Sequence, residues 1–383
     1  MLSLCGAHAL TTNTDRTMAS KNSKEHESET ETAEALQDSS TELTEEKEEE
    51  HVNRLPKFVE LDLPAMGLEF HPAEPLLAAS FIDGTIKLYS CKAQEEPVEV
   101  WSTEGFKKSS RSVRFTEDGE SLVCISKDKS WKLFNTETGK VEREFVKAHD
   151  AAISTVAVAG DKHVVTGDDD GRLKLWDLRF EKAVFEAKQN EDYLSDIAVD
   201  ETNRIVFATS GDGTMSTFNI KRRRFDLQSE NLHSELMCVE IVRRGRKVVC
   251  GGSDGSLNFY NWEEFGDISD RFPGHPESVD FSCKILDDLI CTGSGDGMIR
   301  AVNVYPHRFM GIIGDHGNLP VNNLTVNGEA TILASCGHDQ RIKFWDVEHF
   351  HHIGKLEKKA KVSDKNKRLD AKGKEENFFA DLE

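Results

Sequence analysis

The chain has 383 residues and a formal net charge of −21; 37% of the residues are hydrophobic and 31% are charged. This composition is typical of a soluble globular protein with polar extensions, and no apolar run approaches the roughly 18 residues that a membrane-spanning helix needs. The eight cysteines form no Cys-x-x-Cys pair and no Cys/His cluster at zinc spacing, so they predict small buried thiols rather than a metal site.

The chain begins with an acidic segment. Residues 1–50 contain 13 acidic and 4 basic residues, and the stretch TETAEALQDSSTELTEEKEEE is almost free of aromatic side chains. Such a segment cannot bury enough apolar surface to offset the entropy of ordering it, so we expect residues 1–54 to be a disordered acidic tail. MLSLCGAHAL lacks a basic lead-in and a convincing cleavage site, and therefore does not predict a secretory signal peptide.

Seven segments in the middle of the chain repeat one pattern. An aspartate, mostly followed by glycine, recurs at intervals of 45, 42, 42, 42, 42 and 43 residues. A period of about 40–45 residues is typical of repeats that each form a four-stranded propeller blade. The aligned aspartates are Asp83, Asp128, Asp170, Asp212, Asp254, Asp296 and Asp339. We therefore predict an all-β fold, a seven-bladed β-propeller over residues 55–350.

The residues around each aspartate fit a strand, a turn and a second strand. Asp-Gly accepts the positive φ angles of a tight hairpin turn. In RLKLWD, Leu173 and Leu175 face one side of the predicted strand and Lys174 faces the other, and the other repeats show the same alternation. A large side chain, such as Trp176, follows six residues after most of the aspartates. A closed ring of such small sheets leaves few strand edges exposed.

This pattern resembles that of the WD-repeat family, in which a His, a Ser or Thr, the turn Asp and the Trp form a hydrogen-bonded tetrad inside a blade. The resemblance implies two complete tetrads: His149, Thr166, Asp170 and Trp176 in the third repeat, and His316, Ser335, Asp339 and Trp345 in the seventh. The sixth repeat has Val302 in place of the tryptophan. Because a buried carboxylate requires hydrogen-bond partners, we expect Asp170→Ala to destabilise the fold far more than Asp212→Ala.

The same family closes its ring with a strand from the N-terminal side, which completes the last blade. The stretch PKFVELDL, residues 56–63, has apolar side chains at Phe58, Val59 and Leu61. The resemblance implies that this stretch is the closing strand. Removal of residues 56–63 is therefore expected to cost stability, and removal of residues 1–50 is not.

Several stretches that resemble catalytic or ligand-binding motifs have a simpler explanation. GSGDG at 293–297 resembles a phosphate-binding loop, but it recurs in register with the other blade turns and no helix is predicted after it. HFHHI at 349–353 offers three imidazoles without a carboxylate or thiol to complete a metal site. No GxSxG, HExxH or Walker pattern occurs. We therefore expect no enzyme, no cofactor and no bound metal.

A run of four basic residues falls on a predicted turn of the fourth repeat. The run is Lys221, Arg222, Arg223 and Arg224, and the equivalent position of the third repeat is Arg179. The repeat register predicts that both lie in equivalent turns on one face of neighbouring blades. A turn does not require four like charges, which repel one another, so these five residues are a candidate partner surface. The run also fits a short nuclear import pattern or a phosphate contact.

The sequence WDLR, residues 176–179, has a second interpretation. In WD-repeat substrate receptors of cullin-RING ubiquitin ligases, a WDxR sequence at the end of a repeat contacts the adaptor. The resemblance implies that Arg179 contacts such an adaptor. The other WD sequence, WDVE at 345–348, lacks the arginine.

Residues 351–383 form a basic tail that ends in an aromatic and acidic motif. Its two basic clusters predict nuclear targeting or a weak RNA contact that salt weakens steeply, and a merely solvating tail is the alternative. Phe378 and Phe379 stand between acidic residues and predict a short docking motif or a strip that folds back onto the ring. The targeting residues are Lys358, Lys359, Lys361, Lys365, Lys367 and Arg368.

Several pieces outside the repeat consensus resemble one family of WD-repeat proteins, that of WD repeat-containing protein 55. They are FNIKRRRFDL, GDISDRF, CTGSGDGMIRAVNVYPHR, GHDQRIKFWD and NFFADL. That family is nucleolar and connected with ribosomal RNA production and ribosome assembly. The resemblance implies a non-catalytic scaffold in the nucleus and nucleolus, with the cytoplasm as a further location. Its partners would be pre-ribosomal or nucleolar proteins. The alternative function is the ubiquitin-ligase substrate receptor.

Overall fold

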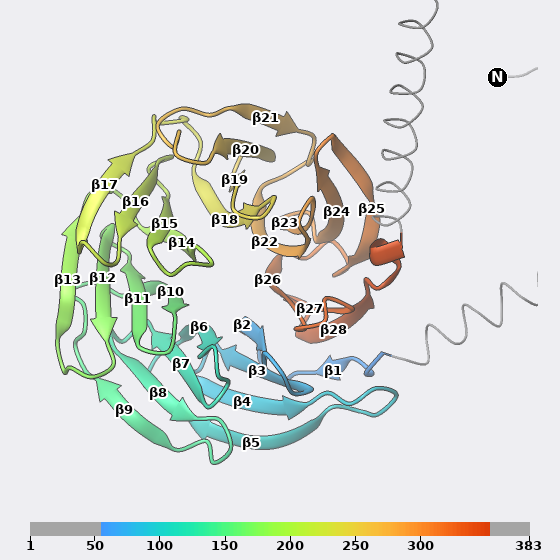
Figure 1. Ribbon diagram of the computed structural model, residues 1–383. Helices are drawn as coiled ribbons and strands as arrows, with labels where there is room; N and C mark the ends of the chain where they lie inside the picture. The colour runs from blue at the N-terminus through green and yellow to red at the C-terminus, as the bar shows by residue number, and fades with distance from the viewer. Residues whose placement is uncertain (1–54, 353–383) are drawn as a thin grey trace, which may run out of the picture. The chain divides into compact units, whose positions relative to one another are not determined.

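The computed structural model describes residues 55–352, which form a ring of seven four-stranded antiparallel sheets (Figure 1). The prediction of an all-β, seven-bladed propeller is confirmed. The predicted acidic tail at 1–54 lies outside the described residues, as does the predicted basic tail from residue 353 onward.

The first six blades each use four consecutive strands, ordered from the inside of the ring to its outside. Blade 1 contains β2 (Ala65–Phe70), β3 (Leu76–Phe81), β4 (Thr85–Ser90) and β5 (Val98–Glu104). Blade 2 contains β6 (Ser110–Phe115), β7 (Ser121–Ser126), β8 (Trp131–Asn135) and β9 (Val141–Phe145), and blade 3 contains β10 (Ile153–Ala159), β11 (His163–Asp168), β12 (Arg172–Asp177) and β13 (Ala183–Lys188). Blade 4 contains β14 (Leu194–Val199), β15 (Ile205–Ser210), β16 (Met215–Asn219) and β17 (Arg224–Gln228). Blade 5 contains β18 (Leu236–Val242), β19 (Lys247–Gly252), β20 (Ser256–Asn261) and β21 (Asp270–Pro273), and blade 6 contains β22 (Val279–Leu286), β23 (Leu289–Ser294), β24 (Met298–Val304) and β25 (His307–Asp315).

Blade 7 joins the two ends of the ring. Its inner strands are β26 (Val321–Val326), β27 (Ile332–Gly337) and β28 (Arg341–Asp346), and its outermost strand is β1 (Val59–Glu60). Val59 lies opposite Ile342, and the N–H of Leu61 donates to the carbonyl of Gln340 at 2.9 Å. The prediction that a strand within residues 56–63 closes the ring is therefore confirmed.

The apolar core lies between neighbouring blades. Seven clusters of buried side chains each combine residues from two adjacent sheets. Between blades 2 and 3, the indole of Trp131 stacks on the ring of Phe145, with centroids 4.0 Å apart, and meets the edge of Trp176 at 5.6 Å. The predicted alternation holds on β12, where Leu173 and Leu175 are buried. Each blade therefore depends on its neighbours to bury its two faces.

The turns of the blades lie on two faces of the ring. We name the strands of each blade A to D from inside to outside; antiparallel order then places the A–B and C–D connections on one face, the AB/CD face, and the others on the DA/BC face. Hydrogen bonds between blades support this arrangement: Glu117, in the A–B turn of blade 2, accepts the N–H of Gly160 at 3.0 Å and the side-chain amide of Asn203 at 3.2 Å. These partners lie in the A–B turns of blades 3 and 4.

The positive φ angles that the Asp-Gly sequences predict occur in the B–C turns of the blades. Gly213 has a φ of +79°, and a Cβ there would lie 2.8 Å from the carbonyl oxygen of Ser234. Glycine is therefore required at this turn both for its conformation and for the close approach of the neighbouring loop.

The seven cysteines within residues 55–352 are buried and unbonded, as the sequence predicts. Burial raises the pKa of several of these thiols, for example that of Cys238 to about 12. Over the same range, no helix is long and apolar enough to cross a membrane.

Candidate functional site: a basic turn, a fixed arginine and the groove beside it

A buried histidine organises the inside of blade 3. The ring nitrogens of His149 lie 2.8 Å from Asp168 Oδ2 and 2.7 Å from Thr166 Oγ1, and Trp176 Nε1–H donates to the same hydroxyl at 2.8 Å. Asp168 is fully buried, whereas Asp170 is exposed. The prediction of Asp170 as the carboxylate of this tetrad is therefore wrong. Side chains alternate along a strand, so Thr166 and Asp168 face the same side of β11. In blade 7 the residue equivalent to Asp168 is Gly337, so the turn residue Asp339 completes that tetrad, whereas in blade 3 Asp168 bonds the histidine and Asp170 is left in the exposed turn.

The Asp168 carboxylate is held in its ionised form. Burial by itself would raise its pKa, but the hydrogen bond with His149 and the backbone N–H groups of Arg172 and Asp170, at 2.9 and 3.1 Å, hold the pKa of Asp168 below its usual range. This one side chain therefore accepts hydrogen bonds from the histidine and from the backbone of the β11–β12 turn.

Blade 7 brings together the four side chains that the sequence assigns to its tetrad. His316 lies 2.8 Å from Asp339 Oδ1 and 2.8 Å from Ser335 Oγ, and Trp345 Nε1–H donates to that hydroxyl at 2.7 Å. Burial lowers the pKa of His316 and so favours the neutral imidazole, although the nearby Asp339 acts in the opposite direction. The chain of hydrogen bonds connects the loop before β26 with β27 and β28.

Blade 6 has only part of this network. His275 lies 2.9 Å from Thr292 Oγ1, but its second ring nitrogen has no hydrogen-bond partner among the described residues. Asp296 instead pairs with Arg300 through both carboxylate oxygens, at 3.0 and 2.6 Å. Burial, together with the nearby Arg300, lowers the pKa of His275 to about 4. In all three blades the polar groups face one another inside the sheet, so they stabilise the blade.

The basic run Lys221–Arg224, which we call the basic turn, connects β16 to β17. All four side chains are exposed, as the repeat register predicts. The N–H of Arg222 donates to the side-chain carbonyl of Asn219 at 2.9 Å, and the N–H of Arg223 donates to the carbonyl of Ile220 at 3.3 Å. The backbone of this turn is therefore fixed by its own hydrogen bonds.

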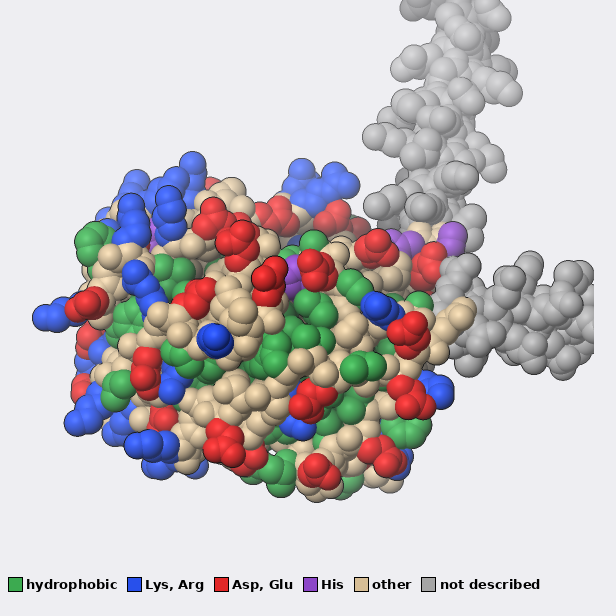
Figure 2. All heavy atoms as spheres, turned by 90° about the horizontal axis from the view of Figure 1, so that it is seen from below, with side chains coloured by type: hydrophobic (Ala, Val, Ile, Leu, Met, Phe, Trp, Pro, Cys, Tyr) green, Lys and Arg blue, Asp and Glu red, His purple; other side chains and the backbone are tan. Residues whose placement is uncertain are grey.

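The charges of the basic turn are mostly unpaired. Arg224 forms an ion pair with Asp226 at 2.8 Å. Within residues 55–352, the side chains of Lys221, Arg222 and Arg223 have no ion-pair partner. Figure 2 shows Lys and Arg side chains concentrated on the left of this view, along both its upper and its lower edge, while acidic side chains are spread over the part that faces the viewer.

Arg179 lies in the C–D turn of blade 3, on the same face as the basic turn. Its guanidinium binds both carboxylate oxygens of Asp177, at 2.9 and 2.6 Å. The Asp177 side chain is fully buried and the Arg179 side chain is 61% exposed. This pair holds the pKa of Asp177 well below its usual range. Because the bidentate pair fixes the guanidinium, Arg179 presents its outer edge to solvent in one orientation.

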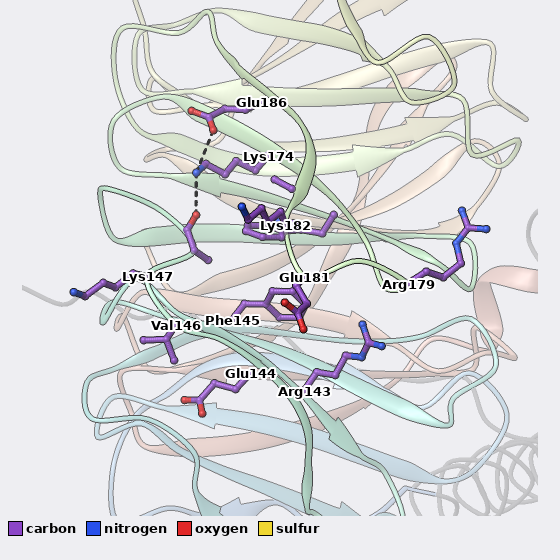
Figure 3. A pocket seen from close by; sticks show the side chains of 13 residues that line it. Arg143, Glu144, Phe145, Val146, Lys147, Lys174, Arg179, Glu181, Lys182 and Glu186 are labelled. Atoms are coloured by element: carbon purple, nitrogen blue, oxygen red, sulfur yellow. Dashed lines mark hydrogen bonds and ion pairs between the residues drawn. The ribbon is translucent and has the colours of Figure 1, made fainter.

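An open groove of about 800 Å³ runs beside Arg179, between the outer strands of blades 2 and 3 (Figure 3). Arg143 and Arg179 lie at one end of this groove, and Lys147 and Val146 lie at the other. The ammonium of Lys174 is occupied in the wall, since it donates to the carbonyl of Ala148 at 2.9 Å and pairs with a glutamate of β13. The remaining charged residues that line the groove are Glu144, Glu181, Lys182 and Glu186.

A model of the WDR55 family matches residues 56–350. The chain belongs to the WDR55 family. WD repeat-containing protein 55 of Bos taurus is 44% identical over 293 residues, which are 76% of this chain and 77% of that protein. The Homo sapiens protein of the same name is 42% identical over 299 residues, or 78% of each chain. A homolog from Drosophila mojavensis is 37% identical over 318 residues, which are 82% of this chain and 62% of that protein.

The match to the WDR55 family covers the blades and neither of the predicted tails. The predicted targeting clusters at 358–361 and 365–368 lie outside the described residues, and so do Phe378 and Phe379. A second basic run, RRGR at 243–246, was not assigned a function from the sequence. The signal that could have found it is the repeat register, because this run falls in the A–B turn of blade 5, on the same face as the basic turn.

Proposed function

We propose that this member of the WDR55 family is a non-catalytic scaffold of the nucleus and nucleolus that supports ribosomal RNA synthesis or processing and ribosome biogenesis by holding protein partners. The observation that carries the proposal is the basic turn, Lys221–Arg224, with three exposed charges that pair with no other side chain of residues 55–352. The side chains of Lys221, Arg222 and Arg223 make no ion pair that stabilises the fold, and binding residues are found disproportionately on loops that a rigid scaffold positions. The nucleolar role is supported by the family resemblance.

The polar networks inside the blades support a scaffold rather than a catalyst. The imidazoles of His149, His275 and His316 are buried and bonded to hydroxyl groups of their own blades. These hydrogen bonds stabilise the blades, so the exposed turns can vary without a change in the fold.

A charge reversal tests the scaffold function. Arg222→Glu/Arg223→Glu is compared with Lys107→Glu/Lys108→Glu, an equal charge change in the exposed D–A connection of blades 1 and 2 on the opposite face. In cells that depend on the introduced protein, we expect the first variant to lose nucleolar partners in proximity labelling and to accumulate ribosomal RNA precursors. The control should behave as wild type. Undiminished partner recovery with an unchanged nucleolar signal in the first variant would refute the assignment.

One observation favours a second function, the substrate receptor of a cullin-RING ligase. The fixed and exposed guanidinium of Arg179 has the form of a preorganised contact at the mouth of a groove. In pull-downs, we expect wild type and Lys140→Ala, a control in the exposed C–D turn of blade 2 outside the groove lining, to recover the ligase adaptor and Arg179→Ala to lose it. Absence of the adaptor from all three samples rules this function out.

A further inference from the structure

Basic side chains from two blades share the AB/CD face. The two turns of blade 4 are joined at their bases, since the N–H of Ile220 donates to the carbonyl of Arg204 at 2.9 Å. The A–B turn of blade 5 adds the RRGR run beside them. We call this set the arginine surface; it consists of Arg204, Lys221, Arg222, Arg223, Arg224, Arg243, Arg244 and Arg246. Its concentration of positive charge stands out in a chain whose net charge is −21.

The members of the arginine surface divide into free and paired charges. Arg224, Arg243 and Arg244 pair with aspartates at 2.8, 3.3 and 2.8 Å, which neutralises them locally. The net positive charge therefore comes from the five exposed side chains that form no ion pair within residues 55–352: Arg204, Lys221, Arg222, Arg223 and Arg246. On the outer side, the acidic β20–β21 connection of blade 5 bounds the surface.

Three arginines of the arginine surface occupy backbone positions that favour glycine. Arg223 has a φ of +50°, and Arg243 and Arg244 have φ angles of +55° and +56° in consecutive positions. The left-handed region is uncommon for residues with long side chains and costs on the order of 1 kcal/mol at each position. The three arginines therefore stand on tight turns with a defined backbone conformation.

An exposed aromatic ring lies at one end of the arginine surface. Tyr305, in the C–D turn of blade 6, is 57% exposed. The guanidinium of Arg243 lies 4.4 Å from the centroid of this ring, and its pair with Asp288 at 3.3 Å anchors it there. A cation that covers one face of the ring holds it in place and leaves the other face for a second planar group.

We propose that the arginine surface binds single-stranded RNA, with phosphates on the free basic side chains and a base stacked on Tyr305. Guanidinium groups match phosphate geometry, and aromatic stacking is the means by which proteins hold unpaired bases. An acidic protein segment would pair with the basic side chains but has no base to stack on the Tyr305 ring. Exposed carboxylates lie on the DA/BC face of blades 4 to 6, for example Asp192, Glu235 and Glu277, and also in the β20–β21 connection of the AB/CD face, so the RNA is directed to the arginine surface itself. The arginine surface includes the basic turn on which the scaffold function proposed above also rests, so the inference names a ligand for that turn; binding of purified RNA tests it separately from partner recovery in cells.

Fluorescence anisotropy tests this proposal with the full chain and a labelled, mixed-sequence RNA of about 20 nucleotides, over about 50 to 200 mM NaCl. We expect Arg222→Glu/Arg223→Glu to weaken binding at least tenfold and to reduce the slope of log affinity against log salt by about 1.4, because two phosphate contacts are lost. Tyr305→Ala should weaken binding about tenfold and leave the slope unchanged. The control Lys107→Glu/Lys108→Glu should change neither quantity.

Three results would overturn the proposal. The first is no measurable binding by wild type at the lowest salt. The second is wild-type affinity in Arg222→Glu/Arg223→Glu together with loss of affinity in Lys365→Gln/Lys367→Gln/Arg368→Gln, which would place the RNA on the C-terminal clusters. The third is a labelled polyglutamate that binds as tightly as RNA, with no effect of Tyr305→Ala on either ligand, which would identify an acidic protein as the partner. Equal melting temperatures show that the variants are folded, and Arg204→Gln/Arg246→Gln repeats the test at two other positions.

Discussion

Replacement of Asp168 by alanine removes the one acceptor that blade 3 shares between its histidine and its turn. The carboxylate is fully buried and accepts from His149 and from the backbone N–H groups of Arg172 and Asp170. A buried donor left without a partner costs about 1–3 kcal/mol, and Asp168→Ala removes the acceptor of three donors. We therefore expect Asp168→Ala to lower the free energy of unfolding by about 3–5 kcal/mol.

The matched control is Asp170→Ala, two residues further along the chain. Its side chain is exposed and accepts no hydrogen bond within residues 55–352, so its replacement should change stability by no more than about 0.5 kcal/mol. Urea and thermal unfolding followed by tryptophan fluorescence, to which Trp176 of the same network contributes, measure both variants. We expect the melting temperature of Asp168→Ala to fall by on the order of 10 °C. Indistinguishable transitions for the two variants would refute the assignment of Asp168.

Three further predictions concern ring closure and buried titratable groups. Deletion of residues 1–63 removes the outermost strand of blade 7 and should lower the melting temperature, whereas deletion of 1–50 should not; equal losses would contradict the role of β1. Burial and Arg300 lower the pKa of His275 from 6.5 to about 4. The stability of the wild type should therefore decrease as the pH is lowered from about 6.5 to about 4, because the unfolded chain binds a proton that the folded imidazole does not. His275→Gln should lose that slope of the urea midpoint against pH, and parallel slopes would count against it. Burial raises the pKa of Glu240 from 4.5 to about 7, so its ionisation costs stability as pH rises through this interval. Glu240→Gln should melt higher than wild type at about pH 8 and equally at about pH 4, and a constant offset between them would disprove the assignment.

The repeat period was enough to predict the architecture because it reports one physical unit seven times. Each blade buries its faces against its neighbours, so the apolar alternation around Leu173 and Leu175 had to recur at the same spacing. The position of the basic turn followed from the same register, since C–D turns of successive blades are equivalent. The closing strand required the family resemblance, because only two residues of β1, Val59 and Glu60, pair with β28.

The repeat alignment failed where one blade departs from the others in detail. It aligned Asp170 with the turn aspartates, and the sequence DDD gave no means of separating three adjacent carboxylates by composition. Burial separates them: Asp168 is the last residue of β11 and still follows the inward alternation of that strand, whereas Asp170 is in the turn. The contact between Arg243 and Tyr305 could not be predicted from the sequence either, because it joins turns of different blades that are 62 residues apart in the chain.

The ring separates the residues that stabilise it from those that are available to partners. The tetrads of blades 3 and 7 are buried between strands, while the basic turn is fixed by backbone hydrogen bonds that its charged side chains do not make. A charge reversal at Arg222 and Arg223 therefore changes the electrostatic surface without removing a bond that holds the blade. For that reason a loss of partner or RNA binding in this variant, at an unchanged melting temperature, reports on the surface itself. The same logic makes Asp168→Ala the complementary perturbation, since it weakens blade 3 and leaves the arginine surface on blades 4 and 5 intact.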